Sequence, residues 1–328
     1  MRTLYYPDDF PEERTGLDTA AHGYAATIGF FDGVHRGHRH VIECLRQQSL
    51  PTMVITFERH PRQVVQPQWQ PLLLTTLQEK QALLARTGID VLVVLRFDAA
   101  MARLTAGEFM LHVLKQQLYV SLLLTGYDNR FGHNRTEGFA DYVRYGQQMG
   151  IRVVAAAACE ENGLRFSSSL IRRQISEGHI AEANACLGRC YTLNGTVAHG
   201  HQIGRTMGFP TANLVPDNPC KLLPPFGVYA VRVSLPPLNS QLSTRISQQE
   251  SLSTYKAIMN IGMRPTFHGH VPTLEVHVFD FDGDLYGRQL TVGFVARLRG
   301  EQAFDTKEAL ACQMRKDAVQ ARQILENP

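Results

Sequence analysis

The sequence predicts an α/β half followed by an all-β half: a doubly wound parallel sheet, then a small antiparallel β-barrel with a helix at its C-terminal end. Three observations predict this arrangement. The chain has 328 residues, enough for roughly two domains of about 150 residues, each with its own core. From residue 24 to about 156, short apolar segments alternate with helical patterns. After about residue 190, strands separated by glycine and proline replace them.

The first half contains five segments of strand character with helix-start signals between them. Thr76-x-x-Glu79 and Thr105-x-x-Glu108 are capping boxes, in which a threonine and a glutamate satisfy the first N–H groups of a helix. Gly88 is placed to end the first of these helices. Because crossovers between parallel strands are right-handed, helices should cover both faces of the sheet. The predicted strands are 24–30, 52–57, 91–95, 120–124 and 151–156.

The second half contains five further strand segments, which predict a small antiparallel barrel. Asp305-x-x-Glu308 predicts the start of a last helix that packs over this barrel. Residues 234–253, rich in Pro, Ser and Gln, predict a long exposed loop between strands. The change of pattern places the domain boundary between residues 185 and 186, giving domains 1–185 and 186–328. The predicted strands are 192–197, 227–235, 255–261, 274–279 and 290–296, and the apolar face of the last helix comprises Leu310, Met314, Ala318, Ala321 and Ile324.

Composition excludes several classes of protein. Hydrophobic residues make up 44% and charged residues 19% of the chain, which is typical of folded globular proteins. The net charge of +3, with the two signs interspersed, does not support a nucleic-acid partner. The longest apolar runs are too short to cross a membrane and residues 1–13 carry no secretory signal, so we expect a cytoplasmic protein. The six cysteines form no C-x-x-C pair and are expected to be thiols.

The first chemical motif is Gly29-Phe-Phe-Asp-Gly33-Val-His35-Arg-Gly37-His38, between the first predicted strand and a helix. A strand-turn-helix junction of a parallel sheet presents free N–H groups and the positive end of a helix to phosphate. Gly33 and Gly37 would let phosphate approach closely, and two imidazoles on one helix face suggest transition-state stabilisation. The alternative is that His35, His38 and His40 are solvated or capping residues, or zinc ligands with Cys44.

The second motif is a glycine-rich segment that ends in Pro210-Thr211-Ala212-Asn213. It is not a Walker loop, because His201 and Gln202 occupy the required Lys and Ser/Thr positions. Its glycines allow backbone approach to phosphate. Thr211 and Asn213 lie two apart on an extended segment, so they point to one side and can jointly hold a hard cation. The phosphate-loop candidates are Gly200, Gly204, Arg205 and Gly208.

A carboxylate on the fourth strand of the second half is the third signal. Glu275 alternates with the apolar residues Leu274 and Val276, so it faces away from the core. A solvated strand-face glutamate is the alternative interpretation. The acidic run 280–284 is not an EF-hand, because Thr291 stands where the bidentate glutamate should be, and Asp282-Gly283 suggests a hairpin turn instead.

The first half resembles the Rossmann-like nucleotidyltransferases with the H-x-G-H motif, and within them the adenylyltransferase half of bacterial bifunctional riboflavin kinase/FAD synthetases. The resemblance extends over segments 56–61, 74–84, 126–132 and 167–172, with departures at Arg59, Asn129, Ser169 and Leu170. It implies that hydroxyls and arginines near the last segment hold ATP phosphates and that aromatic residues contact flavin. The implied residues are His35 and His38 for catalysis; Gly29, Phe31, Gly33, Gly37, Asp128, Arg165, Ser168, Ser169 and Arg172 for ATP; and Phe57 and Phe131 for flavin.

The second half resembles the riboflavin kinases through the P-T-A-N signature, followed by L-E-x-H at 274–277 and Arg299-x-Glu301. The resemblance implies that Glu275 is the general base for the ribityl 5'-hydroxyl and that Thr211 and Asn213 hold Mg2+. It also implies that Gly200, Gly204, Arg205, Gly208, Thr211 and Asn213 contact ATP, and that Asn260, Arg299 and Glu301 contact flavin.

Together these resemblances imply that the chain phosphorylates riboflavin to FMN and then adenylylates FMN to FAD, with release of pyrophosphate. The expected substrates are riboflavin, FMN and ATP with Mg2+. No tightly bound organic cofactor, nucleic acid or membrane partner is expected, and no particular oligomeric state is favoured. Two rival classes remain open: another small-molecule adenylyltransferase fused to a barrel, and a nonenzymatic flavin sensor or storage protein.

Overall fold

The computed structural model describes residues 1–10, 23–126, 130–157, 159–161, 164–199, 208–235, 253–266 and 269–326. The chain divides into two compact units, Met1–Ser168 and Ser169–Pro328. The predicted loop 234–253 lies outside the described residues except at its ends, which belong to strands.

The first unit contains a six-stranded, fully parallel sheet with the order β1-β4-β3-β2-β5-β6. The five predicted strands are confirmed, two of them with the predicted ends and the others with ends shifted by one or two residues. One strand was missed: β1 pairs with β4 at the edge of the sheet, and its short, partly polar sequence carries no clear strand signal. The strands are β1 (Arg2–Tyr6), β2 (Tyr24–Ile28), β3 (Thr52–Phe57), β4 (Val91–Leu95), β5 (Val120–Thr125) and β6 (Arg152–Ala155).

Helices cover both faces of this sheet, as the sequence predicts. Apolar side chains of α4, η2 and α5 form one core with alternate strand residues, while α1 and α3 form the other. The capping boxes at Thr76 and Thr105 are both confirmed, and Gly88 adopts a φ of +75° just after α3. The helices are α1 (Arg36–Arg46), α2 (Pro61–Val65), α3 (Leu77–Ala85), η1 (Met101–Arg103), α4 (Ala106–Glu108), the π-helix η2 (Phe109–Gln117), η3 (His133–Arg135) and α5 (Phe139–Met149), before the short pair β7 (Glu160–Glu161) and β8 (Leu164–Arg165).

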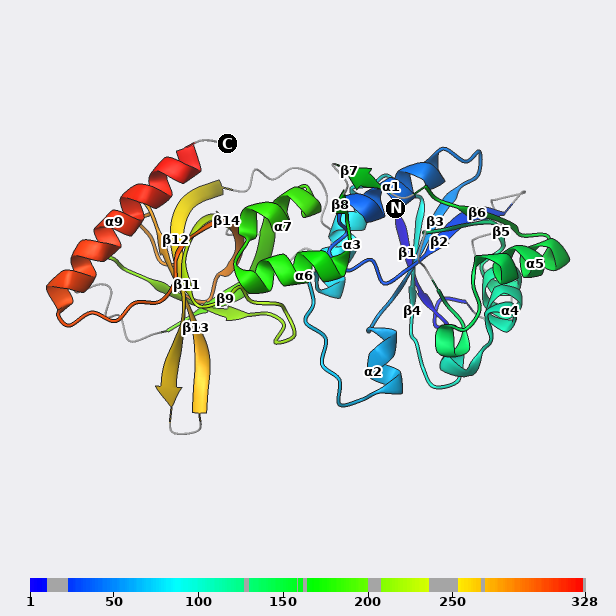
Figure 1. Cartoon of the computed structure of the whole chain (residues 1–328), viewed down its shortest axis with the longest axis horizontal. Helices are drawn as coiled ribbons and strands as arrows, with labels where there is room; N and C mark the ends of the chain where they lie inside the picture. The colour runs from blue at the N-terminus through cyan, green and yellow to red at the C-terminus, as the bar shows by residue number, and fades with distance from the viewer. Residues whose placement is uncertain are drawn as a thin grey trace. The chain divides into compact units, whose positions relative to one another are not determined.

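The second unit is a closed antiparallel barrel with the order β10-β13-β12-β11-β14-β9, preceded by two helices and followed by one (Figure 1). All five predicted strands are confirmed, and the segment after the glycine-rich motif supplies the sixth. The elements are α6 (Ser168–Glu177), α7 (Ile180–Leu187), β9 (Tyr191–Ala198), β10 (Ala212–Pro216), β11 (Gly227–Leu235), β12 (Ser253–Thr266), β13 (Gly269–Val278), β14 (Gln289–Arg299) and α9 (Lys307–Glu326).

Two local predictions for the second unit were wrong. Asp282-Gly283 is not a hairpin turn, because β13 pairs with β12 and β10 whereas β14 pairs with β11 and β9. The connection from β13 to β14 therefore joins strands that are not neighbours. The cap of α9 is Thr306 rather than Asp305: the N–H of Ala309 donates to Thr306 Oγ1 at 3.1 Å.

The terminal helix α9 lies along the barrel, as predicted (Figure 1). Ala321 and Leu325 are buried against Ala230 and Phe279, with Ala318 and Ile324 partly buried beside them. The same helix also buries a charged residue, Asp317, beside the cavity described below. Among the described residues, no helix combines the length and the apolar character needed to span a membrane.

The predicted domain boundary at 185/186 stays a prediction. Contacts group α7 with the barrel: Asn184 Nδ2 donates to the Phe294 carbonyl at 2.8 Å, and the Tyr191 N–H donates to Asn184 Oδ1 at 2.7 Å. By contacts, the division falls after Ser168.

Candidate active sites

The first candidate site lies at the carboxyl edge of the parallel sheet, after β2. The chain leaves β2 toward β3 on one side of it, whereas β5 and β6 lie on the other side. Such a reversal of strand order opens a crevice at the carboxyl ends of the strands, where open α/β sheets bind ligands. The predicted strand 24–30 ends at Ile28, so Gly29 to His35 form the turn at this position.

The turn after β2 has an unusual backbone held by buried hydrogen bonds. Phe31, Gly33 and Val34 have φ values of +53°, +85° and +40°. Residues other than glycine seldom adopt this backbone region. Asp32, only 2% exposed, accepts hydrogen bonds from Leu74 N at 3.0 Å, Thr75 N at 2.8 Å and Thr75 Oγ1 at 3.1 Å. The Gly33 N–H donates to Thr75 Oγ1 at 2.9 Å. The turn therefore depends on contacts with a segment about forty residues away.

His35 and His38 come together as predicted. His35 is the N-cap of α1, and its Nδ1 accepts a hydrogen bond from the His38 N–H at 3.3 Å. The two imidazoles stack with centroids 3.6 Å apart and planes at 21°, and His38 also contacts the Phe31 ring at 5.1 Å. Both rings are therefore held at the positive end of α1, where a phosphate would be stabilised.

Gly37 packs closely against His35, so a side chain at this position would require its neighbours to shift. A Cβ at this position would lie 3.2 Å from His35 Nδ1 and 3.1 Å from the Phe166 carbonyl. Gly29 is similarly close to the Phe31 ring, at 3.2 Å. These glycines permit close packing inside the turn, in addition to the approach to phosphate expected from the sequence.

The serine-rich segment begins at the same turn. Ser168 Oγ donates to the Asp32 carbonyl at 2.8 Å, and the Arg36 guanidinium lies over the Phe166 ring at 5.0 Å. Arg165 precedes this segment at the end of β8, while Ser169 and Arg172 follow within α6. Asp128 lies outside the described residues. The ATP contacts of Arg165, Ser168, Ser169, Arg172 and Asp128 stay predictions.

The two aromatic residues predicted to bind flavin in this half have packing partners. Phe57 contacts Phe97 with centroids 5.7 Å apart. Phe131 stacks on Tyr142 at 4.2 Å and packs against Phe109 at 5.7 Å, while its N–H donates to the Tyr142 hydroxyl at 2.9 Å. Phe131 therefore packs against η2 and α5, two of the helices that cover one face of the sheet. A flavin contact of either ring stays a prediction.

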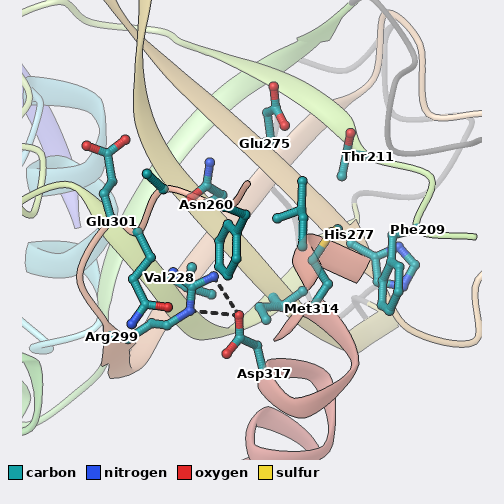
Figure 2. Close-up of a pocket in the computed structure, with 15 residues that line it drawn as sticks. Phe209, Thr211, Val228, Asn260, Glu275, His277, Arg299, Glu301, Met314 and Asp317 are labelled. Atoms are coloured by element: carbon teal, nitrogen blue, oxygen red, sulfur yellow. Dashed lines mark hydrogen bonds and ion pairs between the residues drawn. The ribbon is translucent and has the colours of Figure 1, made fainter. Parts of the chain in front are cut away.

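The second candidate site is a cavity of about 570 Å³ in the barrel unit, shown in Figure 2. It brings together the predicted residues Thr211, Glu275, Asn260, Arg299 and Glu301 from three strands and the segments beside them. Its volume is in the range of a small-molecule site. Further lining residues are Phe209, Val228, Ile258, His277, Gln302, Ala303, Phe304, Leu310, Met314 and Asp317.

Strand register places Glu275 between two amides. On β13, Glu275 pairs with Asn213 of β10 on one side and with Asn260 of β12 on the other. Leu274, Val276 and Val278 are buried, which confirms the predicted alternation. Residues paired across neighbouring strands share a face of the sheet, so Glu275 has an amide side chain on each side. Figure 2 shows Glu275, Asn260 and Thr211 together at one end of the cavity.

An ion pair lies at the other end of the cavity (Figure 2). Arg299 donates from Nε and Nη2 to Asp317 Oδ2 at 2.9 and 2.8 Å, and Gln313 Nε2 donates to Asp317 Oδ1 at 2.7 Å. The Asp317 side chain is 3% exposed and that of Arg299 16%. Arg299 also lies over the Phe304 ring at 5.8 Å. The pair therefore holds Arg299, which is predicted to contact flavin, against α9.

Two further contacts shape the cavity wall. A Cβ on Gly262 would lie 2.9 Å from Glu301 Oε1 and 3.3 Å from Asn260 Nδ2, so glycine at this position leaves room for both side chains. His277 Nδ1 donates a hydrogen bond to the Pro210 carbonyl at 2.8 Å, and the His277 ring lies with its centroid 5.2 Å from that of Phe209. His277 therefore fastens the segment that leads into Thr211.

The glycine-rich motif is described only at its end. Gly200, Gly204 and Arg205 lie outside the described residues. Gly208 has a φ of +79° with open space around its Cα, and Thr211 and Asn213 alternate with the buried residues Ala212 and Leu214. The shared orientation of Thr211 and Asn213 agrees with the sequence analysis. In the described part of the chain, no cluster of three or more His, Cys, Asp or Glu side chains could hold a metal, so the zinc alternative has no support.

Sequence reasoning missed several residues at both sites. It did not identify Thr75 or Lys80 behind the turn, because their contacts join segments 42 and 50 residues apart. It also missed Asp317 of α9, which is buried and lies three residues after Met314 and four before Ala321, on the predicted apolar face. A charged residue within an otherwise apolar helix face was the available signal.

Two family models match the chain: FAD synthetase over residues 17–170 and riboflavin kinase over residues 187–325. Among similar proteins is the bifunctional riboflavin kinase/FMN adenylyltransferase of Escherichia coli (strain K12), 37% identical over 92% of this chain and 93% of that protein. Proteins of the same name from Haemophilus influenzae and Pseudomonas fluorescens are 35% and 36% identical, each over 92% of this chain, and the alignments span 94% and 93% of those proteins.

A solved structure has the same fold. A protein of Streptococcus pneumoniae described as a macrolide-efflux protein superposes with a TM-score of 0.80 and 28% identity, over 98% of this chain and 99% of that one. The order of the two matched models agrees with the order of the two sites, the parallel sheet first and the barrel second. The chain therefore belongs to the family of bifunctional riboflavin kinase/FMN adenylyltransferases.

Proposed function

We propose that the barrel cavity converts riboflavin to FMN and that the turn after β2 converts FMN to FAD. The observation that carries the first assignment is the position of Glu275 on the cavity wall, between Asn213 and Asn260 in register. For the second, it is the stacked pair His35 and His38 at the start of α1. Both assignments agree with the family and with the order of its two domains.

In the barrel, Glu275 accepts the proton of riboflavin's terminal hydroxyl as its oxygen attacks the γ-phosphorus of ATP. A bond forms between this oxygen and phosphorus, the bond to the bridging oxygen breaks, and ADP leaves. Such transfer depends mainly on positioning and on neutralising charge. Arg299, Glu301 and Asn260 hold the flavin, and Phe304 and Met314 supply apolar contact in the same cavity.

The residues near Glu275 fit a magnesium ion bound with ATP. The Thr211 hydroxyl, just before β10, and the Asn213 amide oxygen, on β10, are hard, neutral donors, and phosphate oxygens would complete the shell. When bound, the ion neutralises charge on the transferred phosphate. Thr211 and Asn213 orient the nucleotide toward Glu275.

At the turn after β2, a phosphate oxygen of FMN attacks the α-phosphorus of a second ATP, and pyrophosphate leaves. His35 and His38 donate hydrogen bonds to the oxygens on which charge develops, and the N–H groups at the start of α1 add to this stabilisation. The buried Asp32 holds the turn through Leu74 and Thr75. Ser168, Ser169 and Arg172 hold the remaining phosphates.

Product analysis tests both halves. The full chain is incubated with riboflavin, ATP and Mg2+, and the flavins are separated by chromatography at successive times. FMN should form first and FAD second, and supplied FMN should give FAD directly. Flavin binding without turnover would indicate a sensor or storage protein. ATP-dependent adenylylation with no flavin product would indicate a different small-molecule adenylyltransferase. The cytoplasmic location expected from the sequence remains part of this proposal.

A further inference from the structure

A buried lysine stands behind the turn after β2. Lys80 lies in α3 with 2% of its surface exposed, and its Nζ donates to the Phe30 carbonyl at 3.0 Å and to the Phe57 carbonyl at 3.1 Å. The same Nζ lies 4.2 Å from the centroid of the Phe30 ring. The ammonium group is therefore enclosed by two carbonyls and an aromatic face.

The two carbonyls belong to neighbouring parallel strands at the point where they separate. Phe57 is the last residue of β3, and Phe30 lies two residues beyond the end of β2. Gly29 N donates to the Ile55 carbonyl at 3.0 Å. Beyond this bond, the Lys80 ammonium bridges the segments that follow β2 and β3. Thr56 Oγ1 also donates to the Phe30 carbonyl, at 3.1 Å. Phe30 is therefore held from two directions, one residue before the left-handed backbone of the turn begins.

The segment 74–80 holds the turn at a second place. Leu74 and Thr75 donate to Asp32, two residues after Phe30. The capping box of Thr76 and Glu79 makes the start of α3 rigid, because each side chain bonds to the other residue's N–H. Lys80 and Thr75 are thus fixed relative to each other. Both sides of the turn are fastened to one short segment.

The charge of Lys80 has a cost that an apolar side chain would avoid. Burial lowers the pKa of Lys80 to about 8, although the Asp32 carboxylate opposes this shift. A buried ion is often replaced by an apolar residue without loss of stability. A buried charge at this position, beside the turn proposed to bind phosphates, is better explained by what it does for the turn.

We propose that Lys80 is a positioning residue for FMN adenylylation: it joins the Phe30 and Phe57 carbonyls and so holds the turn in the geometry that presents His35 and His38 to the phosphates. This inference rests on the adenylylation proposed for the turn. Lys80 acts through the backbone of Phe30, five residues before His35. Its loss should therefore reduce kcat for FAD formation more than it changes the KM for FMN or ATP.

The test compares Lys80→Met, Lys80→Arg and Lys115→Met in the full chain. Lys115 donates to the Gly150 carbonyl before β6, at the opposite edge of the same sheet, and serves as the matched control. We expect Lys80→Met to lower kcat for FAD formation by about 10- to 100-fold, as for a small misplacement of catalytic groups. Lys80→Arg should recover part of this loss, because it keeps both the charge and the donors. Riboflavin phosphorylation is measured in every variant as a control that the second unit is intact.

A pH profile tests whether Lys80 positions the turn through its charge or only through the packing of its side chain. The groups facing Lys80 are Asp32 on the turn and, across the Phe30 ring, His60 at the start of α2, with centroids of the two rings 4.7 Å apart. Below pH 8 the ammonium is present, and above it the charge is lost. The kcat of the unmodified enzyme for FAD formation should therefore fall as pH rises through about 8. This decline should be absent in Lys80→Met and in Lys80→Arg, whose guanidinium does not titrate there.

Each result supports or overturns the inference. Undiminished kcat in a folded Lys80→Met variant, or an alkaline decline that persists in it, would overturn the inference. Equal losses in Lys80→Met and Lys80→Arg would do the same. If Lys80→Met does not fold, the comparison of the unmodified enzyme with Lys80→Arg decides, through the presence or absence of the alkaline decline. If the unmodified chain makes no FAD at all, the function proposed for the turn is wrong, which is a distinguishable outcome.

Discussion

The two candidate sites are built in different ways. At the turn after β2, the backbone is held by buried contacts: Asp32 and His35 are nearly inaccessible, and the partners of Asp32 come from a distant segment. In the barrel, Glu275, Asn213 and Asn260 project from paired strands that the barrel itself keeps in register. The comparison teaches that the first site should be sensitive to small changes in packing, whereas the second should lose activity mainly through the loss of individual side chains.

The largest separable effect is expected for His38→Ala. Removing this donor from the start of α1 should lower FAD formation by about 10²- to 10³-fold, by analogy with lost donors at oxyanion sites. FMN formation should remain close to that of the unmodified chain, because the histidine pair lies in the first unit. Both rates are measured on one preparation. A parallel loss of both activities in a folded variant would contradict the assignment of separate sites.

Gly37→Ala tests the sensitivity of the turn to packing. The added Cβ would lie 3.1 to 3.2 Å from the Phe166 carbonyl and the His35 ring, so the ring must move. We expect FAD formation to fall by about tenfold, less than a misplacement of about 1 Å can cause, because the neighbours must shift by a few tenths of an ångström. Gly107→Ala is the matched control, since its Cβ would make ordinary contact, at 3.4 Å, with Tyr145. Equal activity in the two variants would show that the position of His35 is not critical.

Asp317→Asn should give a smaller loss in the barrel. Without the carboxylate, Arg299 stays partly buried without its ionic partner, and the unfolding free energy of the second unit should fall by up to about 3 kcal/mol. The KM for riboflavin should rise about tenfold, which corresponds to about 1.4 kcal/mol. Urea unfolding and kinase kinetics measure both effects. Asp280→Asn removes the exposed partner of Arg322 and should change neither the unfolding free energy nor the KM. If both variants change the KM equally, the Arg299–Asp317 pair has no particular role in flavin binding.

The smallest effect is expected when the units are separated. A fragment that begins near Ala183 should fold and phosphorylate riboflavin, because the barrel has its own closed sheet and core. A fragment that begins at Ser169 should be more stable, since it keeps all of α7, including the buried Ile180. Circular dichroism and kinase assays compare the two. Folded fragments without kinase activity would show that the second unit depends on the first.

Much of this comparison could be predicted from the sequence. The alternation of apolar residues predicted which face of β13 carries Glu275, and the three-residue spacing predicted that His35 and His38 lie together. Both patterns depend only on residues that are close in sequence. The missed strand β1 is short and partly polar, and the hairpin expected at Asp282-Gly283 failed because strand pairing in a barrel is set by the whole sheet. Lys80 and Thr75 were missed for the same reason, because their roles depend on contacts between segments that are far apart in the sequence. Asp317 had a local signal, a charged residue on an apolar helix face, but its partner Arg299 could not be inferred from that signal.

The most direct test of the account measures FMN formation and FAD formation in one preparation of Glu275→Gln. The substitution keeps the size and hydrogen bonding of the side chain between Asn213 and Asn260 but removes the base. FMN formation should fall by about 10²-fold or more, while riboflavin and ATP still bind and supplied FMN is converted to FAD at the unmodified rate. Kinase turnover close to that of the unmodified chain would remove Glu275 as the base, and a matching loss of FAD formation would contradict the separation of the two sites.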